Sequence, residues 1–512
     1  MPTAWETFPV EFKGGLISNL SPLQQGINKV GSATILQNYE PAREGGYRKI
    51  LGYTKFSNTA VAGSGSILGV KVVNSNDAIV ARRDGAVTKY YRGTGTAWTL
   101  LGTATYLGNK VNTEEYNFGS VHKIAFVDGV NYPAIYDVGT STLTFITSAP
   151  TEVFAATYVK SFKNHLFFSK GTKLTFTAPY NDTDFTPASG AGSIDIGHTI
   201  TGLAVFRDIL IVFARNKVLQ VAGNTIADFS LQPITEDIGC INGDTIQEVG
   251  GDILYLAPDG LRLLSATDRN DDFALEIASA PIEKDAKTVI DSTSTYCSTV
   301  IRGKAQYRMF AYVENDAEIS HRGLLATKFS DQGASRIEWA TLKGIKVNVV
   351  DSKYTEGGET IYFGNDDGFI YKMEEGNSFG VNPIRSIFQT PYMPIGDPQI
   401  RKTFYRITLY VTPMGTFSVQ CGIKYDFNRI NNTPIIQPPT FTFNSTSGGV
   451  AVWGDPNAIF GTFVYGGDID KVYTNHLIGS GKTFAIRFDD DALNAPHTLD
   501  AATIEYMPLD RQ

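Results

Sequence analysis

The chain of 512 residues has little cysteine, histidine or methionine, with 3, 6 and 6 of these residues. Its cysteines, Cys240, Cys297 and Cys421, lie far apart in sequence, which argues against a disulfide framework and against a cysteine-based zinc site. The histidines form no HExxH or His-x-His pattern that would gather a metal ion. We therefore expect no metal and no other cofactor.

Long hydrophobic runs and a positive charge excess are also missing. The longest strongly apolar run, Ile209 to Ala214, is far shorter than the roughly 18 residues that span a bilayer. The first residues lack the pattern of a signal peptide, so we expect a chain without a membrane span that is made in a cytoplasm. The net charge of −8 disfavours tight binding to DNA phosphates, which basic clusters make.

Glycine and aromatic residues are abundant, with 50 Gly, 31 Phe and 25 Tyr. Many turns combined with many aromatic residues indicate strands joined by tight connections. Helical periodicity is weak throughout, and its best candidate is Asp285 to Ile290. The sequence therefore predicts an all-β protein.

A hairpin-like unit recurs along the chain: an apolar strand, a turn containing Asp, Asn or Gly, and a second apolar strand. Asp-Gly and Asn-x pairs suit the positive φ that two-residue hairpin turns require. The turns fall at residues 84–85, 128–129, 170–171, 216–217, 259–260, near 315 and at 367–368. A period of about 40–50 residues with several strands per repeat is typical of β-propeller blades.

These spacings divide the chain into three parts. No domain linker interrupts Gly46 to Met393, which favours a propeller of six or seven blades over the alternative, a stack of β-sandwich domains. Residues 394–512 still alternate but lose the repeat, and we expect a β-sandwich-like domain there. Residues 1–45 are predicted to form an N-terminal arm without a core of its own.

Catalytic motifs are weak. Gly479 to Thr483 reads GSGKT, but a phosphate-binding loop needs a glycine where His476 stands and a helix after the loop. A glycine-rich β-turn explains the segment better. No G-x-S-x-G elbow is present, and paired carboxylates cannot be singled out among 52 acidic residues. We therefore expect that the protein is not an enzyme.

Two stretches resemble the tail nozzle proteins of short-tailed phages, also called tail tubular protein B or packaged-DNA stabilisation proteins. The first is Gly14–Phe56, with its Gly14-Gly15-Leu16 opening, its QNYEP segment and its GGYR segment leading to Gly52-Tyr53. The second is Tyr255–Ile282. The chain between these two stretches is similar to this family in the spacing of its repeated hairpins and not in identifiable motifs, and the last 120 residues have no sequence match.

The resemblance implies a structural protein of the virion tail, assembled in the host cytoplasm. Members of that family form a hexameric ring below the portal–adaptor complex, retain the packaged genome and conduct it at ejection. They also hold tail fibres or tailspikes. An acidic wall that repels phosphate suits a tube through which double-stranded DNA slides without specific binding. The alternative is a phage-borne or bacterial propeller that acts as a glycan-binding module or a glycosidase.

The predicted arm carries apolar residues that burial against a neighbouring subunit or the adaptor would explain. The candidate docking residues are Leu16, Ile17, Leu20, Leu23, Ile35, Leu36 and Tyr39.

Overall fold

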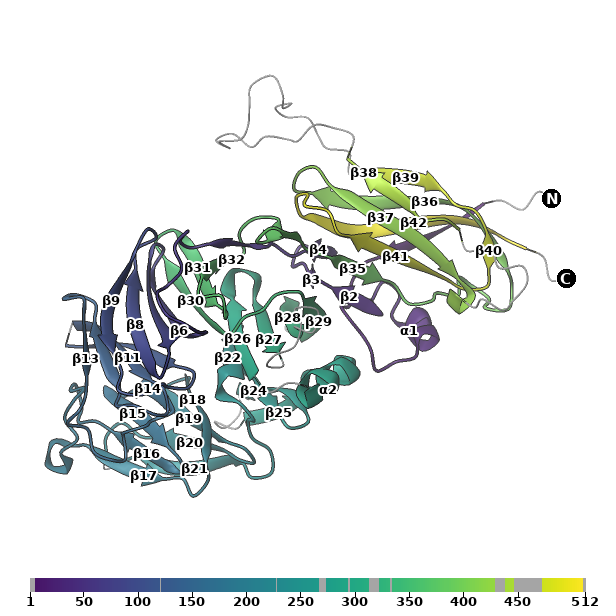
Figure 1. Cartoon of the computed structure of the whole chain (residues 1–512). Helices are drawn as coiled ribbons and strands as arrows, with labels where there is room; N and C mark the ends of the chain where they lie inside the picture. The colour runs from purple at the N-terminus through teal and green to yellow at the C-terminus, as the bar shows by residue number, and fades with distance from the viewer. Residues whose placement is uncertain are drawn as a thin grey trace.

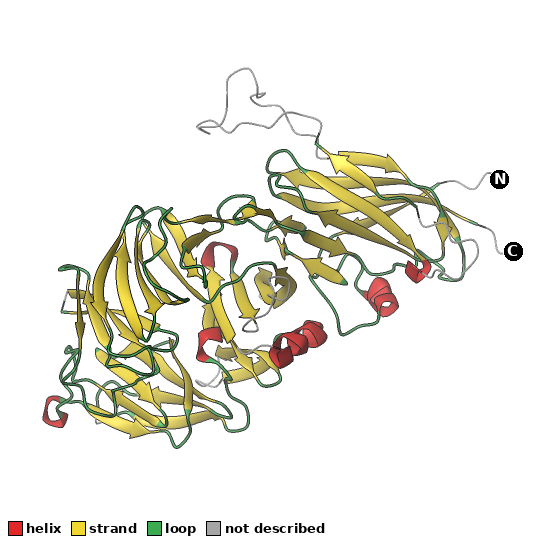
Figure 2. Ribbon diagram, viewed as in Figure 1, coloured by secondary structure: helices red, strands yellow, loops and turns green. Residues whose placement is uncertain are grey.

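The computed structural model describes residues 5–119, 121–226, 228–266, 273–292, 295–312, 322–331, 334–428, 438–445 and 472–509. A propeller and a β-sandwich lie side by side, and strands from the start of the chain pass between them (Figure 1). Helices are few and short among the described residues, and strands dominate both bodies (Figure 2). The expected all-β class, a propeller with a sandwich-like C-terminal domain, is confirmed.

Six successive antiparallel units of four strands form most of the propeller. The first three comprise β6 (Ile67–Asn74), β7 (Asp77–Asp84), β8 (Val87–Gly93), β9 (Trp98–Thr103); β10 (Asn112–Phe118), β11 (Val121–Val127), β12 (Ala134–Asp137), β13 (Thr142–Phe145); and β14 (Tyr158–Phe162), β15 (His165–Lys170), β16 (Lys173–Phe176), β17 (Gly192–Asp195). The next three comprise β18 (Ile200–Phe206), β19 (Ile209–Ala214), β20 (Val218–Ala222), β21 (Ser230–Thr235); β22 (Gln247–Val249), β23 (Asp252–Ala257), β24 (Gly260–Ala266), β25 (Phe273–Ile277); and β26 (Thr295–Ile301), β27 (Gln306–Tyr312), β28 (Arg322–Asp331), β29 (Ala334–Lys343).

A composite unit closes the ring. Its first three strands are β30 (Val349–Thr355), β31 (Gly358–Gly364) and β32 (Ile370–Met373), and β5 (Tyr53–Lys55) from the start of the chain pairs antiparallel with β32. The small hairpin of β33 (Ser378–Phe379) and β34 (Asn382–Pro383) extends this sheet. The closing unit packs against the first one, where the Val72 N–H donates to Asp351 Oδ2 at 2.8 Å. Six units of contiguous chain and one composite unit agree with the predicted six or seven blades.

The repeated turns occupy equivalent places. Each one that lies in the described residues joins the second strand of its unit to the third. The glycines of the four Asp-Gly turns, Gly85, Gly129, Gly260 and Gly368, all have the positive φ that the turn chemistry predicts. The turn expected near Asn315 lies outside the described residues.

The C-terminal domain packs two sheets face to face. One sheet contains β36 (Lys402–Pro413), β39 (Val472–His476), β40 (Ser480–Gly481) and β42 (His497–Pro508). The other contains β35 (Ser386–Gln389), β37 (Ser418–Tyr425), β38 (Phe441–Asn444) and β41 (Phe484–Asp490). Strand alternation turns Ile407 and Leu409 of β36 toward Ile423 and Ile486 of the facing sheet, and these side chains are buried in one core cluster.

The start of the chain forms part of this sandwich, which corrects the expected arm at 1–45. β1 (Glu6–Glu11) pairs with β42, and the hairpin of β3 (Tyr39–Pro41) and β4 (Tyr47–Lys49) pairs with the same strand. β2 (Ile35–Gln37) lies between β29 of the propeller and β35 of the sandwich. One nine-stranded sheet therefore runs from the sixth unit into the sandwich.

The boundaries of the two domains consequently differ from 46–393 and 394–512. The propeller begins at β5 and its last unit ends with the β33–β34 hairpin, whereas β35 belongs to the sandwich. Pairing between strands far apart in sequence sets these domain boundaries. The spacing of the hairpin turns does not predict that long-range pairing.

Two α-helices occur in the described residues. α2 (Glu283–Ser292) confirms the helix candidate around Asp285 to Ile290. α1 (Pro22–Asn28) was not predicted, although Ser21, Pro22 and Gln24 form a capping box with proline at the first helical position. Short 3₁₀ turns cover Pro187–Ser189, Gly243–Thr245, Ala280–Ile282, Arg302–Lys304 and Asp426–Asn428.

Candidate functional site

A groove of about 840 Å³ lies where the two domains join. The segment between β1 and α1 forms one wall of this junction groove, with Leu16, Ile17 and Leu20. The rest of the lining includes Ala280 and Pro281, which precede α2, and β29 residues around Trp339.

The groove brings together the two stretches that carry the nozzle resemblance. The backbone N–H groups of Ser18 and Asn19 donate to the Pro281 carbonyl at 2.9 and 3.3 Å. Trp339 Nε1–H donates to the Ala278 carbonyl at 2.9 Å, and the Leu16 N–H donates to the Trp339 carbonyl at 2.7 Å. Segments more than 200 residues apart are therefore fixed to one another through β29.

The seven candidate docking residues fall into three groups, and the expectation that all contact another subunit needs correction. Leu36 and Tyr39 are fully buried within this chain, and Leu16 and Ile17 are nearly so. Leu20 and Ile35 are half-buried. Leu23 alone among the seven is exposed. The buried residues hold the chain's own core together because their segment pairs with the sandwich.

α1 presents an exposed apolar pair that the sequence analysis did not single out as a pair. Leu23 and Ile27 are 37% and 57% exposed, and their i,i+4 spacing places them on one side of the helix. The capping box at Ser21 is the sequence signal that could have identified this helix and therefore its exposed side.

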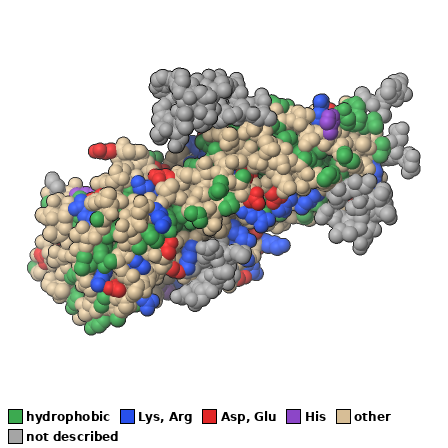
Figure 3. Space-filling model, turned by 45° about the horizontal axis from the view of Figure 1, so that its top comes forward, with side chains coloured by type: hydrophobic (Ala, Val, Ile, Leu, Met, Phe, Trp, Pro, Cys, Tyr) green, Lys and Arg blue, Asp and Glu red, His purple; other side chains and the backbone are tan. Residues whose placement is uncertain are grey.

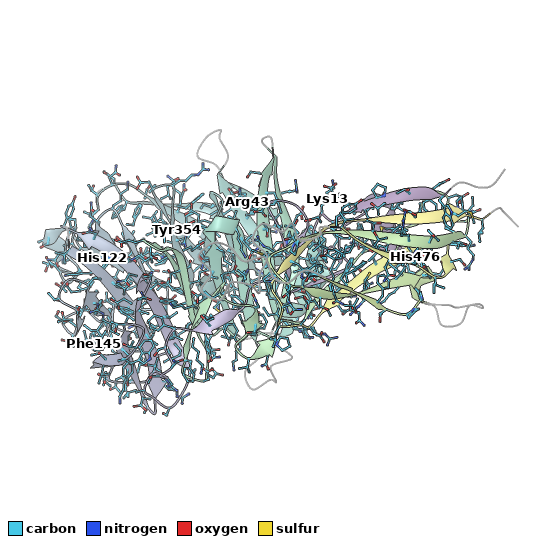
Figure 4. All side chains as sticks on the ribbon, turned by 90° about the horizontal axis from the view of Figure 1, so that it is seen from above. Lys13, Arg43, His122, Phe145, Tyr354 and His476 are labelled. Atoms are coloured by element: carbon cyan, nitrogen blue, oxygen red, sulfur yellow. The ribbon has the colours of Figure 1, made fainter. Side chains whose placement is uncertain are left out.

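Charges of both signs surround the junction groove. Lys13 Nζ lies 2.5 Å from Glu11 Oε2, and Arg336 Nε lies 3.1 Å from Glu338 Oε1. Lys13 and Arg43 lie near the junction of the two domains, whereas His476 lies on the sandwich (Figure 4). On the face drawn in Figure 3, basic and acidic side chains are interspersed, and basic ones gather near the middle of the molecule.

The propeller axis holds a second, polar cavity of about 320 Å³. The first strand of every unit contributes to its lining. Lys71, Glu115, Lys160, Gln247 and Asp351 come from β6, β10, β14, β22 and β30 respectively. The periodicity of the repeat thus places one inner strand per unit around the axis.

Opposite charges pair across and beside this axial cavity. Lys71 Nζ lies 3.2 Å from Asp351 Oδ2 and 3.8 Å from Glu115 Oε2, and Lys353 Nζ lies 2.5 Å from Glu115 Oε1. The other pairs are Lys160–Glu114 at 2.7 Å and Lys110–Asp244 at 3.0 Å.

This pairing favours the charged forms of Glu115 and Lys71. Burial acts to raise the pKa of Glu115, but the hydrogen bond from Lys353 and the charge of Lys71 outweigh it and lower that pKa. Burial acts to lower the pKa of Lys71, but Asp351 and Glu115 raise it overall. A general acid for glycoside hydrolysis needs a raised carboxyl pKa, and Glu115 has the opposite shift.

The GSGKT segment forms a connection between strands. β40 ends at Gly481 and β41 begins at Phe484, so no helix follows the loop. The N–H groups of Lys482 and Thr483 donate to Asp426 Oδ1 at 2.8 and 3.1 Å. These donors are therefore directed at the chain's own carboxylate.

Comparison with known proteins identifies no family for this chain. No family model matches the sequence, and no curated protein matches it. Solved structures that are similar include the extracellular domains of two putative hybrid two-component systems from B. thetaiotaomicron. One has 10% identity and a TM-score of 0.38 over 63% of this chain, and the other has 10% identity and a TM-score of 0.34 over 77%. The matches span 41% and 43% of those chains.

No helix in the described part of the chain is both long enough and apolar enough to cross a bilayer.

Proposed function

We propose that the chain is a structural subunit of the tail nozzle of a short-tailed phage. In this role, copies form a six-fold ring below the adaptor, and the genome passes through the ring's lumen. The outer face of the ring holds tail fibres or tailspikes. The observation that carries the proposal is that the two stretches resembling nozzle proteins pack against each other at one groove.

The axial cavity supports a particular arrangement of such a ring. Paired side chains from the inner strands occupy the propeller axis, so the DNA path lies between subunits and not through a propeller. The net charge of −8 favours a wall that does not retain phosphate.

We further propose that the exposed side of α1 docks onto the adaptor. Leu23 and Ile27 offer apolar contact area beside the junction groove, and their replacement leaves the core intact because both are exposed.

The test combines the full-length chain with rings of a purified candidate adaptor protein, analysed by sedimentation velocity and electron microscopy. We expect six-fold rings on the adaptor for the natural chain, and loss of docking for the double variant Leu23→Glu, Ile27→Glu. Val381→Glu, at an apolar residue that is 88% exposed in the β33–β34 turn, is the matched control. The absence of this chain from purified virions, or docking by the double variant equal to that of the control, would refute the corresponding proposal.

A further inference from the structure

A buried polar cluster lies inside the sandwich, away from both cavities described above. It consists of Lys49 on β4, Asp490 at the end of β41, His497 at the start of β42, and Tyr39 on β3. All four residues are at most 2% exposed. The cluster joins the start of the chain to its last strands, because Lys49 and Asp490 are 441 residues apart.

We propose that Lys49 and Asp490 form an intramolecular isopeptide bond that covalently joins the two sheets of the sandwich. Lys49 Nζ lies 2.9 Å from Asp490 Oδ2 and donates to the Ala492 carbonyl at 3.0 Å. These contacts hold the amine against the carboxyl group, and such fixed proximity accelerates bond formation strongly.

The surroundings of Asp490 favour its reactive form. Burial raises the pKa of its carboxyl group despite the nearby charge of Lys49. A proton passing from the lysine ammonium to this carboxylate leaves a neutral amine and a neutral acid, which are the nucleophile and the electrophile of amide formation. The Ala492 N–H donates to Asp490 Oδ1 at 2.8 Å and stabilises negative charge that develops on that oxygen.

His497 is placed to transfer the second proton. Its Nδ1 lies 3.7 Å from Asp490 Oδ2 and has no hydrogen-bond partner among the residues that the structure describes, while its Nε2 pairs with the Tyr39 hydroxyl at 2.9 Å. Burial and the charge of Lys49 lower the His497 pKa to about 3, so the imidazole is neutral. When Nε2–H donates to Tyr39, Nδ1 carries the free lone pair that accepts a proton.

The reaction balances without an oxidant or a second reactant. Lys49 Nζ attacks Asp490 Cγ and the C–N bond forms. His497 Nδ1 takes a proton from the nitrogen and delivers it to Oδ2. The Cγ–Oδ2 bond then breaks and one water molecule leaves. The product is a neutral amide in a buried site where an ion pair is costly to desolvate.

Mass spectrometry of the purified full-length chain tests the proposal. We expect an intact mass lower by one water molecule. After trypsin, we expect peptide 49–55 joined to peptide 488–511, because an acylated Lys49 is not cleaved. Lys49→Met should restore the full mass. Asp490→Asn should lose one ammonia instead of one water. His497→Leu should slow the loss of water.

A second buried lysine–aspartate pair provides an internal control. Lys328 contacts Asp252 in the propeller, where the aspartate side chain is 18% exposed, and we expect this pair to stay unlinked in the same digest. Recovery of peptides 50–55 and 488–511 as separate species from the natural chain, even after prolonged incubation, would overturn the proposal. This outcome requires no variant to fold, and it leaves the proposed nozzle function unaffected.

Discussion

At the scale of single residues, Glu40 on β3 connects the two domains. Its fully buried carboxylate accepts from Arg48 Nε at 2.8 Å, from Lys304 Nζ at 2.7 Å and from Arg308 at 3.0 Å. Glu374 pairs with Lys304 and Arg308 from the other side. Burial acts to raise the pKa of Glu40, but Lys304, Arg308 and Arg48 outweigh it and lower this pKa to about 2.

The cluster makes stability depend on pH. The pKa of Glu40 falls from an ordinary value of about 4.3 in the unfolded chain to about 2 in the folded chain. The stabilisation is therefore complete above the unfolded value and is lost as the pH falls through the folded value.

We expect Glu40→Gln to reduce the free energy of unfolding by about 3 kcal/mol at neutral pH, because it removes one of the two carboxylates that neutralise Lys304 and the buried Arg308. The difference from the natural chain should shrink as the pH falls from about 4.3 toward 2. Denaturant unfolding over that pH range measures both effects. Glu11→Gln, in an exposed pair with Lys13, is the control and should change little. If the stability difference between Glu40→Gln and the natural chain does not vary with pH, Glu40 does not have the lowered pKa described above.

At the scale of elements, strand β5 closes the propeller. Tyr53 packs its ring on those of Phe363, Tyr371 and Phe379, with centroids 4.9–5.6 Å apart. Gly52 precedes it and runs so close to β33 that an added Cβ would lie 1.9 Å from the Ser378 carbonyl oxygen. A side chain at this position therefore competes with closure of the last unit.

We expect Gly52→Ala to lower the free energy of unfolding by about 2 kcal/mol or more, because backbone must move to admit the methyl group. Gly357→Ala is the matched control, since its added Cβ would come no closer than 3.9 Å to Ser75. Thermal unfolding of both variants and hydrogen exchange of β5 and β32 amides are the measurements. Equal stability of the two variants would show that the β5 contact is not required for closure.

The sequence predicts the propeller units better than their closure. Turns such as Asp84-Gly85 and Asp259-Gly260 depend on local chemistry, because positive φ favours glycine, and their spacing reveals the repeat. The pairing of β5 with β32, of β1 with β42 and of β2 with β35 has no such local signal. Apolar residues such as Leu36 therefore suggest an interface from the sequence alone, although the partner strand belongs to the same chain.

The candidate sites divide in the same way. The absence of a helix after GSGKT is readable from the alternation of the residues from Phe484 onward. The contact between Lys49 and Asp490 cannot be predicted from the sequence. It requires β4 and β41 to lie in facing sheets, and strand pairs that are far apart in sequence set that arrangement.

At the scale of the whole molecule, the start of the chain is a structural part of the sandwich. Val10, Phe12, Leu36 and Tyr39 are fully buried there. Burial of one such side chain contributes about 1.5–3 kcal/mol. The loss of all four is therefore comparable to the roughly 5–15 kcal/mol free energy of unfolding of a typical protein.

We therefore expect deletion of residues 1–40 to unfold the sandwich and not merely to prevent docking. Calorimetry and limited proteolysis of the truncated chain should show loss of protection from β35 onward. A synthetic peptide of residues 1–45 added in trans should restore part of that protection. If the truncated chain unfolds at the same temperature as the complete chain, the strands at its start contribute no stability.

The pairing of β1 with β42 also has a consequence for biosynthesis. β1 must wait for a partner that emerges almost 500 residues later, which takes roughly 25–100 s at typical translation rates. β5 likewise waits for β32 before the ring can close. Several propeller units can form on the ribosome before β42 emerges, but the sandwich is completed only once β42 is available. Until then, the apolar strands at the start of the nascent chain are unpaired. They can bind chaperones, or the matching strands of other nascent chains on the same mRNA.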